Sequence, residues 1–112
     1  MKNDMTENEL IKKYQQLSLR DGDELILSRE NTLSLVSDCE KKKIGILGFD
    51  GVRVANDSIV PDMSAIADFS TMFEEESDWG TMVHKSIEAS RKFIESISDK
   101  EISFIPTLNE KQ

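Results

Sequence analysis

The chain has 112 residues, with 22 acidic against 14 basic side chains and a formal net charge of −8. A chain of this length fits one domain with a single modest core, so we expect residues 1–112 to form one unit whose ends, 1–5 and 107–112, are frayed. The negative charge argues against nucleic acid or an anionic membrane surface as a partner, because both attract basic faces. A basic protein is the natural complement of such a chain.

Cysteine usage and hydropathy indicate the compartment. The single cysteine, Cys39, excludes an intrachain disulfide. The first residues have no apolar signal-peptide core, and no apolar run approaches the ~20 residues of a membrane span. We therefore expect a cytoplasmic protein.

Three segments place apolar residues at helical spacing behind a capping residue. Thr6 precedes the first segment, Ser28 the second, and Ser77 or Asp78 the third. The third is the longest, and its broad apolar face is typical of a helix lying on a sheet. We predict helices over about 7–18, 29–42 and 79–97.

The strongest β signal lies between the second and third predicted helices. Residues 44–60 read as a β-meander that begins with a glycine-marked strand. The pair Asp50-Gly51 predicts a tight hairpin turn, because a type I′ turn needs positive φ at both central positions. A later short strand is expected to end at Pro61, which has no backbone N–H to donate.

Other segments are less determined. Residues 62–69 favour a short helix or turn, since they are alanine-containing and begin at Asp62, but a strand over 65–69 is the alternative. Residues 73–78 predict a polar loop, and 25–27 are either a very short strand or a buried linker. We expect an α+β fold, in which a small, mainly antiparallel sheet (about 44–60 plus 102–105) carries three helices on one face.

No catalytic set is visible. His84, the one histidine, lies on the polar side of a predicted helix, and Cys39 lies on an apolar helix face. One Cys and one His cannot form a zinc cluster. The acidic turns at 21–24 and 50–51 do not match a calcium-binding loop. We predict no catalytic residue, no metal site and no cofactor.

Acidic residues are concentrated in one segment. Residues 62–78 contain six acids and neither Lys nor Arg. They form either a solvated loop that complements the N-terminus of the next helix, or an electronegative patch that covers a basic cleft of another protein. Trp79 is equally a core residue or an interface anchor. The candidate binding residues are Asp62, Asp68, Glu74, Glu75, Glu76, Asp78 and Trp79, with Asp21, Asp23 and Glu24 beside them.

Three short motifs carry a family resemblance. The sequences ILGFDGVR at 46–53, IVPD at 59–62 and IADFS at 66–70 resemble bacterial immunity proteins of polymorphic-toxin and contact-dependent inhibition systems, in particular the group called immunity protein 40. The likeness covers about residues 24–105. It implies a cytoplasmic, non-enzymatic protein that binds the C-terminal domain of a cognate toxin, often a nuclease, and blocks it. No toxin-contacting residue transfers by motif.

Charge and resemblance together predict neutralisation of a basic toxin domain, of nuclease type, whose active site is occluded by an acidic surface. Two alternatives remain open. One is a generic acidic adaptor or regulatory module. The other is a small metal-dependent hydrolase, in which the carboxylates of Asp50, Asp57, Asp62 and Asp68 would converge on a divalent ion.

Overall fold

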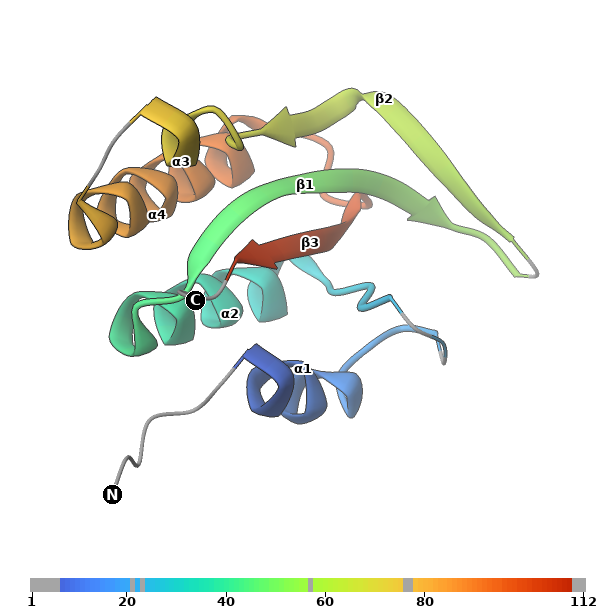
Figure 1. The fold of residues 1–112 in the computed structure, drawn as a ribbon. Helices are drawn as coiled ribbons and strands as arrows, with labels where there is room; N and C mark the ends of the chain where they lie inside the picture. The colour runs from blue at the N-terminus through green and yellow to red at the C-terminus, as the bar shows by residue number, and fades with distance from the viewer. Residues whose placement is uncertain (1–6, 21, 23, 57, 76–77, 110–112) are drawn as a thin grey trace.

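A computed structural model describes residues 7–20, 22, 24–56, 58–75 and 78–109 (Figure 1). The described residues form an α+β fold, as the sequence predicts. Four helices and three strands occur among them. In chain order they are α1 (Glu7–Gln15), α2 (Arg29–Lys42), β1 (Gly45–Val54), β2 (Ile59–Asp68), α3 (Met72–Glu75), α4 (Trp79–Ser96) and β3 (Ser103–Asn109).

The sheet has the strand order β2-β1-β3, and both pairings are antiparallel. β1 is therefore the central strand, whereas β2 and β3 are edge strands. Helices α2 and α4 pack against each other and against β1. Helix α1 packs on α2 and lies farther from the sheet in Figure 1. The two larger helices thus cover one face of the sheet, as predicted, whereas the first helix, predicted on the same face, packs on α2 instead.

The core lies between these helices and the sheet, and Phe49 of β1 is at its centre. Its ring stacks on Phe93 of α4 at a centroid distance of 5.8 Å and meets the edges of Phe69 and Phe104. Burying a side chain of this size contributes about 1.5–3 kcal/mol through the hydrophobic effect. The fold therefore depends on β1 more than on either edge strand.

Local capping explains why the predicted helices form. Ser28 accepts a hydrogen bond from the amide of Asn31, and Asp78 accepts one from the amide of Thr81. Each bond satisfies a backbone donor that the first turn of a helix leaves unpaired. Lys43 ends α2 in the left-handed conformation with φ 58°. The predicted bounds of α2 are correct, and those of α4 are correct to one residue.

The predicted hairpin turn at Asp50-Gly51 is wrong. β1 continues through both residues to Val54, and the amide of Ala55 donates a hydrogen bond to the carbonyl of Ser58 just before β2 begins at Ile59. Gly51 serves a different purpose, because a Cβ on it would overlap the Cβ of Ala65. A glycine allows β2 to approach β1 closely at this point.

The expected end of the strand at Pro61 is also wrong, and so is the favoured helix or turn over 62–69. β2 runs through Pro61 to Asp68. Because β2 is an edge strand, its outer side has no neighbouring strand. Proline, which has no backbone N–H, is tolerated there without loss of a hydrogen bond between strands. The register jumps from Val52↔Pro61 to Asp50↔Ile66, so residues 62–65 form an irregular bend opposite Gly51.

Three further boundaries differ from expectation. Part of the predicted loop at 73–78 is the short helix α3, whose Phe73 packs on Trp79 at a centroid distance of 5.6 Å. β3 extends to Asn109, so 107–109 are paired with β1 rather than frayed. Helix α1 ends at Gln15, three residues earlier than predicted.

The segment 25–27 lies between α1 and α2 and is buried throughout. Leu27 forms an isolated bridge with Phe104 of β3. Of the two expectations for this segment, the buried linker is therefore correct, with a single strand-like contact at its end.

Candidate functional site

The face of the sheet opposite α2 and α4 is open over the middle of the strands. Asp50, Ile66 of β2 and Ile105 of β3 stand opposite one another across the sheet. Opposed residues of an antiparallel pair project to the same face, and neighbours along a strand alternate. Phe49 points into the core, so Asp50 and its row point away from the helices. Asp50 and Ile66 are exposed, in agreement with this assignment.

The next row, which contains Asp68 and Thr107, completes a shallow hollow of about 330 Å³ on this face. Its floor includes Gly48, which has no room for a side chain because a Cβ there would overlap the carbonyl oxygen of Ala67. A bare backbone at this point keeps the hollow open. The lining residues are Leu47, Gly48, Phe49, Asp50, Ile66, Ala67, Asp68, Ser70 and Thr107.

The hollow is acidic, because Asp50 and Asp68 contribute carboxylates and none of its lining residues is Lys or Arg. The two acids are diagonal neighbours, since Asp68 stands opposite Gly48. Hydrogen bonds from the side chain and amide of Ser70 lower the pKa of Asp68 below its ordinary value. Asp68 is therefore ionised at neutral pH, and one cationic side chain of a partner could reach both carboxylates across roughly 7–8 Å.

One exposed apolar side chain lines this acidic hollow. Ile66 of β2 is 43% exposed, and the side chains of Ile59, Val60 and Met63, which lie farther along β2, are between 39% and 78% exposed. Isolated apolar residues on a surface are ordinary, but Ile66 lies beside two carboxylates. Apolar groups beside charged groups are a composition found at protein–protein interfaces. We call the hollow, which includes Ile66, the open face.

The structure distributes the predicted acidic segment over several environments. Asp62 lies 3.7 Å from Arg53, which also binds Asp99, so its charge is partly neutralised. Hydrogen bonds from the side chain and amide of Ser64 lower the pKa of Asp62 further. Of those predicted acids of 62–78 that the structure describes, Asp68 is the one that lines the hollow.

The remaining predicted residues do not gather with Asp68 in the hollow. Glu74 is exposed on α3, Glu75 ends α3, and Glu76 lies outside the described residues. Asp78 caps α4. Glu24 is exposed beside β3, whereas Asp21 and Asp23 lie outside the described residues. The structure therefore does not bring the predicted acids into one continuous patch among the residues it describes.

Trp79, the first residue of α4, contacts two other helices. Its indole N–H donates a hydrogen bond to the carbonyl of Lys43 at 3.0 Å, and its ring packs on Phe73. These contacts join the start of α4 to the end of α2 and to α3. They favour the structural role over the role of interface anchor.

The sequence analysis does not include Asp50 and Thr107 among the candidate binding residues. It treats Asp50 as a turn residue, where a carboxylate is ordinary, and names it beside Asp68 only as a metal ligand of the hydrolase alternative, and it places Thr107 in a frayed end. The alternation of Gly48 and Asp50 around Phe49 could have identified a face opposite the core. The register that aligns these residues with Asp68 was not readable from local sequence.

No catalytic geometry accompanies the open face among the residues that the structure describes. His84 and Glu88 form an exposed pair at 3.3 Å on α4, and Cys39 is buried. Within the described ranges, no three or more His, Cys, Asp or Glu side chains are arranged to hold a metal ion. Asp57, one of the four acids of the hydrolase alternative, lies outside those ranges. None of the described helices is both long and apolar enough to cross a membrane.

Comparison with family models, with curated proteins and with solved structures finds no match for this chain.

Proposed function

We propose that this chain is a cytoplasmic immunity protein that binds a basic toxin domain, of nuclease type, and occludes its active site. The observation that carries the proposal is the acidic hollow of Asp50 and Asp68 on a sheet face that no described helix covers. The net charge of −8 and the resemblance of residues 46–70 to immunity proteins support it. These features are those of a binding surface rather than of a reaction centre.

The open face suits a basic protein partner for two reasons. The exposed side chain of Ile66 offers apolar area that is removed from water on binding, which contributes about 25 cal/mol for each Å² buried. The carboxylates select a positively charged surface and speed the encounter, since electrostatic attraction raises association rates by roughly 10–1,000-fold. Apolar contacts would thus provide affinity, and charge would provide speed and selectivity.

A co-expression experiment tests the function. An immunity gene is expected to follow the gene of its toxin directly, and a cell making that toxin domain is expected to survive only when this chain is also made. Continued killing would exclude the immunity function. Survival without formation of a complex would exclude occlusion as the mechanism.

Neutral variants test the surface. Asp50→Asn with Asp68→Asn removes two charges but keeps the shape of the hollow, and the amide oxygen of an asparagine can still accept the bond from Ser70. The matched control is Glu88→Gln with Glu95→Gln, which removes two exposed charges from α4. We expect association with the toxin domain to slow by about tenfold for the first pair and to change little for the second. Equal effects would mean that net charge alone acts, and the open face would not be the interface.

A further inference from the structure

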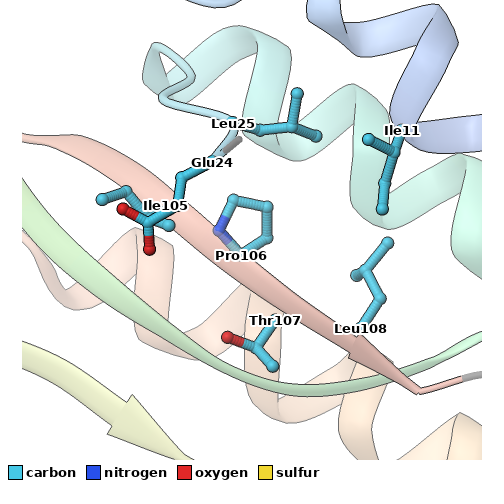
Figure 2. A pocket seen from close by; sticks show the side chains of 7 residues that line it. All are labelled: Ile11, Glu24, Leu25, Ile105, Pro106, Thr107 and Leu108. Atoms are coloured by element: carbon cyan, nitrogen blue, oxygen red, sulfur yellow. The ribbon is translucent and has the colours of Figure 1, made fainter. Parts of the chain in front are cut away.

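A second concave feature lies at the opposite edge of the sheet. A groove of about 130 Å³ separates the outer edge of β3 from helix α1. Ile11 of α1 and Leu25 form one side, and residues 105–108 of β3 form the other (Figure 2). In Figure 2, the side chains of Leu108 and Ile11 point toward each other across the groove. Its lining is mainly apolar, and the one charged side chain among the lining residues is Glu24.

The backbone along this groove is a partly unused strand edge. Phe104 exchanges two hydrogen bonds with Leu27, at 2.8 and 2.9 Å, so its backbone groups point away from β1. Backbone direction alternates along a strand, and therefore the groups of Pro106 and Leu108 point to the same outer edge. The bridge ends at Leu27, and no backbone hydrogen bond joins that side of Pro106 or Leu108 to another described residue.

Proline suits position 106, because it has no backbone N–H. In any other residue that N–H would point to the outer edge, where no strand accepts it. No described residue bonds to the carbonyl of Pro106 or to the N–H and carbonyl of Leu108 on this side, so these groups can pair with an incoming strand. Such an edge pairs most readily with an extended backbone, and side-chain pockets beside it then select alternate residues of the added strand.

We propose that this groove binds a short extended segment of a basic protein, added antiparallel or parallel to β3 along residues 106–108. One apolar side chain of the segment enters the space between Ile11 and Leu108, and a Lys or Arg pairs with Glu24. The chemistry of the groove does not depend on the activity of the partner. Only the identification of the partner as a toxin domain rests on the proposed function.

Charge selects this occupant over a second copy of the chain. Two copies with a net charge of −8 each repel, and the exposed carboxylate of Glu24 would have to meet a basic residue of the same chain. The groove also adjoins the open face, because Thr107 lines both hollows. A partner whose body covers the open face could therefore place an extended segment around the edge of β3.

Synthetic peptides test the groove without any toxin. The probe is an acetylated and amidated hexapeptide of alternating valine and threonine with one terminal lysine, titrated into the full isotope-labelled chain. We expect NMR shift changes at the Leu108 amide and at the Ile11 and Leu25 methyl groups. Replacing the lysine by glutamate is expected to weaken binding about tenfold, and methylating the backbone amides of the peptide to abolish it.

Exchange of charge in the protein provides the matched control. Glu24 is exposed, so Glu24→Lys is expected to fold with an unchanged melting temperature and to prefer the glutamate peptide. Equal binding of the two peptides by the original chain, shifts located elsewhere, or no binding of either peptide would overturn the proposal. Concentration-dependent self-association through residues 105–108 without peptide would assign the groove to a second copy and would overturn it as well. Because no toxin is present, these failures are distinct from failure of the co-expression experiment.

Discussion

β1 and β2 are adjacent strands of ten residues each, yet they have opposite environments. Most residues of β1 are buried, whereas Ala65 is the one buried residue of β2. Both sequences are rich in apolar residues, so composition does not explain the difference. β1 lies between two strands and beneath two helices, while β2 is an edge. Apolar side chains therefore stabilise the core in β1, whereas most of those in β2 are exposed to solvent.

The largest expected contrast is between truncations of the two strands. Phe49→Ala removes the ring at the centre of the core and is expected to lower the free energy of unfolding by about 3–5 kcal/mol. Ile66→Ala removes a side chain that is 43% exposed and is expected to cost less than about 1 kcal/mol. Urea unfolding at constant m-value measures both. If both variants lost similar amounts of unfolding free energy, Ile66 would be packed against other residues, and this face of the sheet would not be exposed.

A smaller contrast concerns two glycines with very different surroundings. Gly48→Ala places a Cβ against the carbonyl of Ala67 and is expected to destabilise the protein by about 1–3 kcal/mol. The control is Gly80→Ala in the first turn of α4, where the nearest atom lies 3.7 Å away. Because alanine favours helix, this change is expected to stabilise by up to about 1 kcal/mol. Thermal unfolding of both variants decides whether β1 and β2 approach as closely as described.

The smallest expected effect is a dependence of stability on pH. Two acids are compared: Asp38 on the helical side of the molecule, and Asp68 on the open face. Asp38 accepts hydrogen bonds from Lys13 at 2.8 Å and Tyr14 at 2.7 Å. Burial raises its pKa, but these two bonds outweigh burial and lower the pKa below the ordinary value. A carboxyl whose pKa is lowered by folding stabilises the protein above its unfolded pKa of about 3.9, and that contribution is lost as pH falls through the folded pKa.

Asp38→Asn is therefore expected to cost about 1 kcal/mol at pH 7 and progressively less at acid pH. Asp68→Asn on the open face is expected to show a weaker dependence on pH, since Asp68 is exposed and is held only by the nearby Ser70. Urea midpoints at neutral and acid pH measure the difference. An advantage of the original chain over Asp38→Asn that persists unchanged at low pH would contradict the assigned network.

The helices were predictable because their signals are local. The cap at Ser28, the lysines at the end of α2 and the apolar face of α4 each lie within one segment, so neighbouring residues decide the structure. The resulting α+β class and the placement of two helices on one face of the sheet followed from them. The acidic character of the chain was also readable from composition.

The course of β2 and the membership of the open face were not predictable in this way. Pro61 and Asp50-Gly51 are strong local signals for a strand end and a turn, and both were overridden. Proline is tolerated because β2 became an edge, and Gly51 is used for a close approach of Ala65. Both outcomes depend on which strands pair.

By itself, the sequence determined the three longer helices, the fold class, the charge and the presence of a buried glycine-marked strand. Only the tertiary structure decided which acids share a surface. It separated Asp62, bound by Arg53, from Asp68, and brought Asp68 beside Asp50 of the neighbouring strand. The physical reason is that hydrogen-bond register fixes which residues of two strands stand opposite each other. Register is set by packing of the whole core and not by any one segment.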